Sequence, residues 1–314
     1  MAAATMDRAW TASALEARVV RYADLKPCLN AFIDTRTPGS SAKENFTIIG
    51  PGVSENPDQH VHIAEAHGFN IGGARQPPGC TNSQHSHDTA EVFVVHTGRW
   101  RFDFGEHGDD AQIHAGPGDV VSFPTKAFRG FRNVGGETGF LWSVLGGDDP
   151  GRVTWAPQVF AMAKDYGLVL LENGALVDTA AGQTVPAGVA PMPVTDRSTI
   201  AGLRMMRPED EDEVLARAPV AALPGETLVI GDGGELPAAE GFTLTRLTLD
   251  GDDRSAEISR AVAEVVFVQT GAVAVITPAA TLMLGAGDTM TVPAGTPRAY
   301  SSEGDATLFV VRGV

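Results

Sequence analysis

Short runs in which apolar and polar residues alternate, bounded by Gly, Pro and Asp, occupy two long stretches of the chain. The runs of the first stretch are residues 46–50, 68–72, 91–104, 119–123 and 139–145. Those of the second stretch are residues 227–231, 241–249, 264–276, 288–292 and 306–311. Short strands at this spacing are typical of an all-β barrel or sandwich. Helices are predicted only between the stretches, over residues 157–166 and over the acidic segment 208–218.

The two stretches are copies of each other, because matched residues follow one another in the same order in both. The matched pairs are Gly68 with Gly241, Glu91 with Glu264, Gly98 with Gly271, Gly118 with Gly287, Asp119 with Asp288, Pro124 with Pro293 and Arg129 with Arg298. Such self-similarity indicates an internal duplication. We therefore predict two barrels, formed by residues 1–155 and 216–314, joined by a connector with short helices over residues 156–215.

The overall charge argues against some classes of partner. With 39 Asp and Glu against 23 Lys and Arg, the chain of 314 residues has a formal net charge of −16. It lacks the basic stripe with which nucleic-acid-binding proteins neutralise phosphates, and an acidic surface disfavours anionic membranes. No apolar run reaches the roughly 18 residues of a membrane span, and residues 1–15 lack the apolar core of a signal peptide. We expect a cytoplasmic protein that binds neither nucleic acid nor membranes.

Candidate metal ligands cluster in the first copy, at His85, His87 and Glu91. Histidines two residues apart on a strand leave the same face. Two imidazoles and one carboxylate, with coordination positions left open, form the facial triad typical of non-haem iron. A straight strand would separate His85 from Glu91 by about 20 Å. Residues 88–90 must therefore bend the chain, and Asp and Thr suit such a bend.

This segment resembles the first sequence motif of the cupin superfamily. The residues that match the first motif are Gly79, His85, His87, Glu91 and Gly98, and those that match the second are Gly118, Pro124 and Asn133. In the second copy, the second motif is matched by Gly287, Pro293 and Gly295. The resemblance implies a bicupin, with two antiparallel jelly-roll (double-stranded β-helix) barrels that each enclose a pocket. The arrangement is similar to that of quercetinase-type and gentisate-type dioxygenases.

Arg129 stands where that family usually has a fourth ligand, a histidine five residues after the proline of the second motif. A guanidinium offers no lone pair to a metal, so three interpretations follow. In the first, the triad alone holds the metal, and Arg129 binds an anionic substrate group or stabilises developing negative charge. In the second, another histidine completes the set; the candidates are His60, His62, His67 and His114. In the third, no metal binds and Arg129 pairs with Glu91.

The second copy has Ile258 and Arg260 in place of the two histidines, so it cannot bind a metal in the same way. Glu264 and Arg298 nevertheless remain at the places of the first copy's glutamate and arginine. A Glu–Arg pair that survives without the histidines suggests a buried, charge-assisted bridge. This supports the third interpretation for the first copy as well. Since an ion pair does not require two inward histidines, we favour metal binding in the first barrel and regard the second barrel as degenerate.

Phe93 shares the strand parity of Glu91, and Phe131 lies two residues past Arg129, so both are candidate substrate contacts as well as candidate core residues. We predict one divalent metal ion, Fe(II) in preference to Mn, Ni or Zn, in an oxygenase for a small anionic or aromatic molecule. A metal-assisted isomerase or lyase and a non-catalytic protein that binds or senses a small ligand are the alternatives. Since cupins often pair through sheet edges, the resemblance also allows a homodimer.

Overall fold

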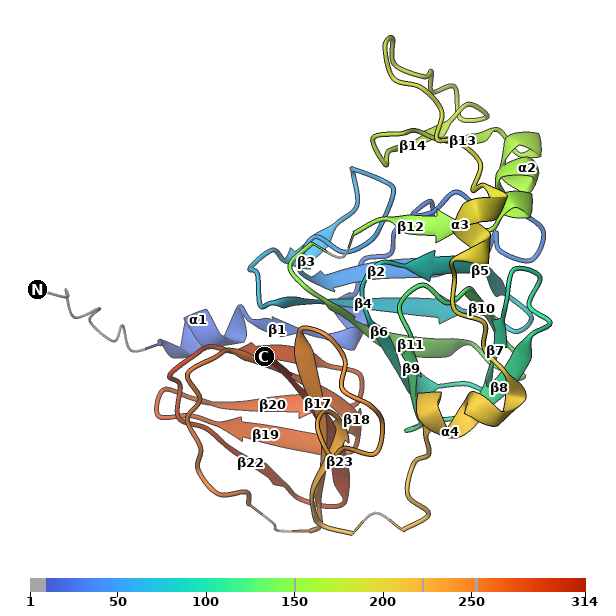
Figure 1. The fold of residues 1–314 in the computed structure, drawn as a ribbon. Coiled ribbons are helices and arrows are strands. Elements are labelled where there is room, and N and C mark those ends of the chain that lie inside the picture. Colours follow the sequence, from blue (N-terminus) through green and yellow to red (C-terminus); the bar gives the residue numbers. More distant parts are fainter. Residues whose placement is uncertain (1–9, 150, 222, 252–253) are drawn as a thin grey trace, which may run out of the picture. The chain divides into compact units, whose positions relative to one another are not determined.

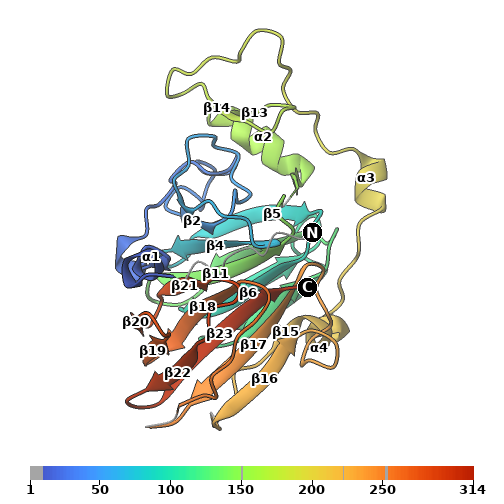
Figure 2. The same ribbon diagram turned by 90° about the vertical axis from the view of Figure 1, so that its left-hand side faces the viewer.

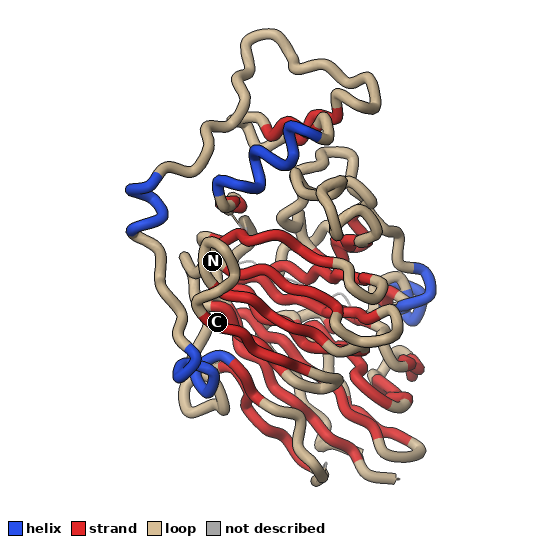
Figure 3. The backbone as a smooth tube through the Cα atoms, turned by 90° about the vertical axis from the view of Figure 1, so that its right-hand side faces the viewer, coloured by secondary structure: helices blue, strands red, loops and turns tan. Residues whose placement is uncertain are grey.

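Strands make up most of the regular structure in the computed structural model, which describes residues 10–149, 151–221, 223–251 and 254–314. Helices are few and short (Figure 3). The prediction of an all-β protein is therefore confirmed. The expectation that residues 1–15 lack the apolar core of a signal peptide rests mostly on residues 1–9, which lie outside the described residues. No helix among the described residues is long and apolar enough to span a membrane.

Contacts within the chain define two units, whose boundaries differ from the expected ones. One unit is Lys26–Ala218, and the other combines Pro219–Val314 with the described part of Met1–Leu25. The start of the chain thus packs on strands of the second copy, and the expected connector belongs to the unit of the first copy. We name the units the N-terminal barrel and the C-terminal barrel, after the sequence copy that each contains (Figure 1).

The N-terminal barrel consists of two sheets around one core. In order across the larger sheet, the strands are β15 (Leu215–Ala216), β9 (Val120–Phe123), β6 (Glu91–Thr97), β11 (Gly139–Gly146), β4 (Phe69–Gln76), β2 (Glu44–Ile49) and β3 (Val61–Ile63). Those of the smaller sheet are β12 (Val153–Trp155), β5 (Thr81–His87), β10 (Arg129–Asn133), β7 (Trp100–Phe104) and β8 (Ala111–Ala115). All neighbours are antiparallel except β2 and β3.

Among its described residues, the C-terminal barrel repeats this order with fewer strands. Figure 2 labels its strands. Its larger sheet contains β1 (Val19–Val20), β21 (Thr289–Val292), β18 (Glu264–Thr270), β23 (Ala306–Gly313), β17 (Phe242–Leu249) and β16 (Gly225–Ile230). Its smaller sheet contains β20 (Thr281–Gly285), β19 (Ala272–Ile276) and β22 (Ala299–Ser302). The segment that corresponds to β5 forms only isolated bridges among its described residues, at Arg254 and Ile258.

The remaining elements are short. They are α1 (Ala12–Glu16), η1 (Tyr22–Asp24), α2 (Pro157–Asp165), β13 (Leu168–Leu170), β14 (Leu176–Asp178), α3 (Arg197–Ala201), η2 (Pro208–Asp210) and α4 (Glu211–Val214). The helix predicted over 157–166 is present as α2, which has proline in its first turn, where no backbone donor is needed. The helix predicted over 208–218 ends at Val214, because Leu215 and Ala216 pair with β9 instead.

Each larger sheet ends in a two-residue strand from a distant part of the chain. β1 pairs with β21, and β15 pairs with β9. An arginine follows each edge strand: Arg21 Nη1 lies 3.0 Å from Asp288 Oδ2, and Arg217 Nη1 lies 3.2 Å from Asp119 Oδ2. The duplication therefore includes these edge strands, which are too short to show an alternating pattern in the sequence.

Inward side chains of both sheets fill the N-terminal barrel. Phe93 and Val95 of β6 pack with Phe102 of β7 in one buried cluster, and burial of such side chains stabilises the fold by roughly 1.5–3 kcal/mol each. His96 has the opposite parity and packs against Phe140, with ring centroids 6.1 Å apart. The alternation read from the sequence thus separates the inside of the barrel from its outer face.

Candidate metal centre

Strands β5 and β6 bring the three predicted ligands together. His85 and His87 lie at the end of β5, Glu91 begins β6, and residues 88–90 form the bend between them. One ligand atom from each of the three side chains lies within 4.8 Å of the other two. All three side chains are buried. The structure therefore places the predicted set at one point inside the N-terminal barrel.

The protonation of His85 follows from its hydrogen bond. Its Nδ1 lies 2.7 Å from the carbonyl oxygen of Ser83. Because a carbonyl oxygen only accepts, Nδ1 carries the proton and donates it. Nε2 then has an available lone pair, which is the arrangement found in metal-bound histidines. The ring of Trp155 packs on this imidazole, with centroids 5.1 Å apart.

Both imidazoles are neutral near pH 7. Burial lowers the pKa of His85 and of His87 well below the ordinary value of 6.5, and the positive charge of Arg129 lowers both further. His87 Nε2 lies 3.9 Å from Glu91 Oε1, and its buried Nδ1 has no hydrogen-bond partner among the described residues. Two neutral imidazoles beside a carboxylate are a donor set that suits a divalent transition metal. The residues present therefore fit such an ion.

Arg129 pairs with Glu91 and is not among the residues that line the adjoining cavity. Its Nη2 forms an ion pair with Glu91 Oε2, and its Nη1 donates to the backbone oxygen of His85 at 3.2 Å. Burial lowers the pKa of Arg129, the neighbouring carboxylate opposes this shift, and a guanidinium stays charged. The pair uses Oε2 whereas Oε1 faces His87. Ion pairing and metal binding therefore use different oxygens of Glu91 and do not exclude each other.

The other histidines that could supply a fourth ligand lie elsewhere. Within the described ranges, the triad is the group with the spacing of a metal site. His60 and His62 pack on each other with ring centroids 4.5 Å apart, and His114 is exposed on β8. The structure brings none of the four candidates to the triad; these are His60, His62, His67 and His114.

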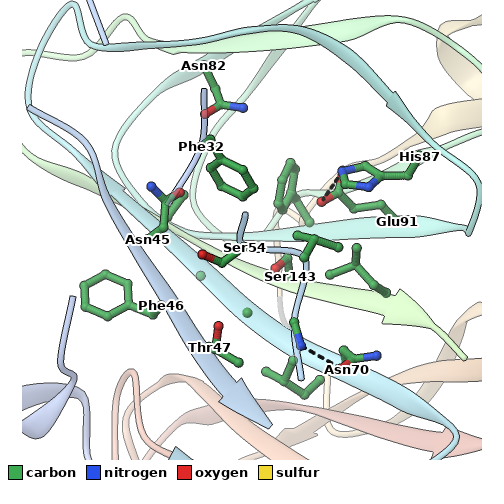
Figure 4. Close-up of a pocket in the computed structure, with 18 of the residues that line it drawn as sticks. Phe32, Asn45, Phe46, Thr47, Ser54, Asn70, Asn82, His87, Glu91 and Ser143 are labelled. Atoms are coloured by element: carbon green, nitrogen blue, oxygen red, sulfur yellow. Dashed lines mark hydrogen bonds and ion pairs between the residues drawn. The ribbon is translucent and has the colours of Figure 1, made fainter. Parts of the chain in front are cut away.

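A cavity of about 60 Å³ adjoins the triad. Phe93 and Phe131 line it, edge to face with centroids 5.2 Å apart, and both also belong to the core. Figure 4 shows His87 and Glu91 on one side of the cavity, across from polar side chains of β2 and β4. The polar residues that line it, apart from the triad, are Asn45, Thr47, Ser54, Gln59, Asn70, Asn82 and Ser143.

Most of this polar lining was not predicted from the sequence. On β4, Asn70, Gly72 and Ala74 share one parity and line the cavity together with Ile71 and Gly73 of the other parity. A Cβ atom at Gly72 would lie only 2.9 Å from Ser143 Oγ, so a larger residue there would displace the cavity wall. Small and polar residues at alternate positions of a strand are the signal that could have revealed this wall, because a filled core would use large apolar residues there.

A buried carboxyl group orients Trp155. Glu55 Oε1 accepts from Trp155 Nε1 at 2.6 Å, and its Oε2 accepts from the backbone nitrogen of Ile33 at 2.7 Å. Burial raises the pKa of Glu55 to about 8. Glu55 also lines a second cavity of about 200 Å³, and residues 52–54 line both cavities. Through Trp155, Glu55 helps to fix the His85 ring.

A second buried group fixes the backbone of β5. Asp34 Oδ2 accepts from the backbone nitrogen of Ser83 at 2.9 Å. Lys43 is fully buried, pairs with Asp34 and donates to Asn82 Oδ1 at 2.8 Å. Because Ser83 in turn accepts from His85, this buried ion pair positions the strand that carries both histidines. Neither Asp34 nor Lys43 was predicted from the sequence to have this role.

The C-terminal barrel has a different set of side chains at the corresponding place. Ile258 faces Arg298 across an isolated antiparallel bridge, as the first histidine faces the arginine in the other barrel. Glu264 is fully buried and forms ion pairs with Arg298 and Arg312. No group with metal-site spacing occurs in the described part of this barrel.

A comparison with known protein families finds a match within the N-terminal barrel. Residues 74–144, which include the triad, match the family model described as Cupin domain. None of the curated proteins matches the sequence of the chain.

Solved structures resemble the chain over most of its length. Oxalate decarboxylase from Bacillus subtilis is 11% identical and covers 94% of this chain and 75% of its own, with a TM-score of 0.57. The nickel complex of bacterial pirin YhhW from Escherichia coli is 10% identical and covers 93% and 96%, with a TM-score of 0.53. Salicylate 1,2-dioxygenase from Pseudaminobacter salicylatoxidans is 16% identical and covers 78% of this chain and 71% of its own, with a TM-score of 0.49. At these identities the likeness concerns the fold alone.

Proposed function

We propose that this chain, whose residues 74–144 match the Cupin domain model, is a metal-dependent enzyme of the cupin type with one centre, in the N-terminal barrel. His85, His87 and Glu91 hold a divalent ion, Fe(II) in preference to Mn, Ni or Zn. The observation that carries the proposal is the convergence of two buried imidazoles and one carboxylate within 4.8 Å, next to a polar cavity. Three protein ligands leave coordination positions open for substrate and dioxygen.

The charge of the site favours an anionic substrate. Arg129 already compensates the charge of Glu91. Because Glu91 is the only anionic ligand of the triad and Arg129 already balances it, the two positive charges of a bound divalent cation remain uncompensated. Uncompensated charge in a buried site is costly, so a carboxylate or a similar anion gains the most from entering. Asn45 adds a donor, because its buried Nδ2 has no hydrogen-bond partner among the described residues and the residue lines the cavity.

The size of the cavity narrows the substrate further. Its volume of about 60 Å³ is less than half of the roughly 150 Å³ of an engineered apolar cavity that holds benzene. The lining is rich in amides and hydroxyls, which suit oxygen-rich molecules. We therefore favour a small aliphatic carboxylate over an aromatic molecule, and oxygenation as the reaction. When bound, the metal supplies Lewis acidity and a place where substrate and oxygen meet.

A metal analysis combined with oxygen uptake tests the proposal. Protein purified without chelator and reconstituted anaerobically with Fe(II) should contain close to one ion per chain. It should consume oxygen with at least one member of a panel of oxalate, malonate, glycolate and salicylate. The matched variants are His87→Ala, which should lose both properties, and His114→Ala, which alters an exposed histidine of the same barrel and should keep both.

The outcomes separate the alternative functions. Carbon dioxide release or substrate isomerisation without oxygen uptake would replace oxygenation by metal-assisted lyase or isomerase chemistry. Metal-loaded protein that binds a panel member without turning it over would support the non-catalytic alternative. Protein that refuses Fe, Mn, Ni and Zn would overturn the metal centre itself.

A further inference from the structure

The C-terminal barrel contains a cluster of arginines at the place that corresponds to the metal centre. Glu264 is fully buried, and its two oxygens form ion pairs with Arg298 and Arg312. Arg260 Nε lies 3.9 Å from Glu264 Oε1. These residues come from β18, β23 and the segments before β18 and β22, so the fold and not local sequence brings the four charges together.

The charges of this cluster do not balance. Three guanidinium groups face one carboxylate, which leaves a net charge of +2. The N-terminal barrel differs at this point, because Leu145 occupies the position of Arg312 opposite the glutamate. One more carboxylate, Glu226 on β16, acts on the neighbouring Tyr300 but is exposed. Even with Glu226 counted, one positive charge remains uncompensated.

Burial makes this uncompensated positive charge energetically unfavourable. The side chain of Arg298 is 1% exposed and that of Arg312 is 18% exposed. Burial lowers the pKa of Arg298, the neighbouring Tyr300 opposes that shift, and the charges of Arg312 and Arg260 add to it. A guanidinium does not give up its proton under ordinary conditions, and a buried charge without a partner destabilises the fold strongly.

Donors in the cluster are also unused. Arg298 Nε is buried and has no hydrogen-bond partner within the described residues. Arg312 Nη1 reaches only Thr245 Oγ1, at 3.3 Å. Arg260 is 45% exposed, so one side of the cluster opens to solvent. Arginine forks recognise planar or tetrahedral oxyanions with paired hydrogen bonds.

We propose that the C-terminal barrel binds a small oxyanion, a carboxylate or a phosphate-like ion, through Arg260, Arg298 and Arg312. The anion enters from the side of Arg260 and accepts hydrogen bonds from the unused donors. The bound anion neutralises the positive charge of the three arginines that Glu264 alone does not balance. The barrel that has lost the metal ligands has thereby become a binding site of the opposite polarity, for an anion instead of a cation.

Calorimetry and thermal unfolding of the full chain test this site. His87→Ala is introduced first, so that an anion bound at a metal ion does not contribute. Inorganic phosphate, sulfate and acetate are titrated against sodium chloride of equal ionic strength. We expect saturable binding and a rise in the unfolding temperature that chloride does not produce. Preference for acetate identifies a carboxylate site, and preference for phosphate or sulfate identifies a tetrahedral-anion site.

Arg312→Leu is the decisive variant, because the N-terminal barrel folds with Leu145 at this position. It should weaken anion binding at least tenfold, whereas Arg254→Leu, the same change at an exposed arginine of this barrel, should leave binding unchanged. If Arg312→Leu does not fold, Arg260→Met, at the exposed side of the cluster, should weaken binding several-fold. Absence of anion-specific stabilisation in the parent, or equal binding by Arg312→Leu and Arg254→Leu, would overturn the proposal.

Discussion

Replacement of Arg129 by methionine should leave the Glu91 carboxylate buried without a partner. Arg129 is 1% exposed and the side chain of Glu91 is 6% exposed, so bulk water replaces the guanidinium poorly. Removal of one member of a buried ion pair costs about 3–5 kcal/mol. At a urea dependence of about 2–3 kcal/mol per molar, this loss lowers the unfolding midpoint by about 1–2.5 M.

Tryptophan fluorescence in urea suits this measurement. Three of the four tryptophans, Trp100, Trp142 and Trp155, are buried in the N-terminal barrel, so the signal follows the barrel that carries the mutation. Arg132→Met, at an exposed arginine of the same strand, is the matched control and should change stability by less than about 0.5 kcal/mol.

Addition of a divalent metal makes the test specific. In Arg129→Met the metal should restore at least half of the lost stability, because it supplies the positive charge that Glu91 has lost. The wild-type barrel should gain less from the same metal concentration. A loss below about 1 kcal/mol, or an equal gain from metal in both proteins, would refute the view that Arg129 balances a buried Glu91 charge.

Four further changes follow from the same site. His87→Ala should lower the metal content from about one ion per chain to less than a tenth, as measured by mass spectrometry of the purified protein. The pKa of His85 and of His87 lies below 6.5, so below that pH the unfolded chain binds more protons than the folded chain. The free energy of unfolding of the metal-free protein should therefore fall by up to about 1.4 kcal/mol per histidine for each pH unit below about 6.5. Urea titrations at several pH values measure this loss. The pKa of Glu55 is raised to about 8, so the sign is opposite: stability should fall as pH rises from about 4.5 to 8, and Glu55→Gln should flatten that fall. Leu145→Arg places a guanidinium opposite Glu91, as in the other barrel, and should abolish metal binding while the fold is kept.

Each of these has a control and a contradicting result. His114→Ala should bind metal normally, and equal losses in both histidine variants would indicate general damage. An acid-induced loss of the same size in a His85→Leu, His87→Leu double variant would assign it to other groups. Alkaline destabilisation that persists in Glu55→Gln would exclude Glu55 as its source. Full metal occupancy in Leu145→Arg would show that the charge at this position does not control the site.

The boundaries between the units illustrate what a local pattern cannot show. The alternating runs predicted the long strands, but β1 and β15 are two residues each and have no period to detect. Their positions depend on pairing with β21 and β9 and on Arg21 and Arg217 reaching aspartates far along the chain. Such pairings are decided by tertiary contacts, so the helix predicted over 208–218 gives way to an edge strand.

The sequence by itself determined the all-β class, the duplication and the triad. Alternation at period two, repeated glycines and the spacing of His85, His87 and Glu91 are local properties that a strand and a bend express directly. Only the tertiary structure decided what surrounds the triad, because the partners come from distant strands. It placed Arg129 on one oxygen of Glu91 and brought Arg312 to the matching glutamate of the other barrel. Whether one arginine or several surround the buried carboxylate depends on side chains 34 to 48 residues away along the chain, which only the closed barrel brings into contact.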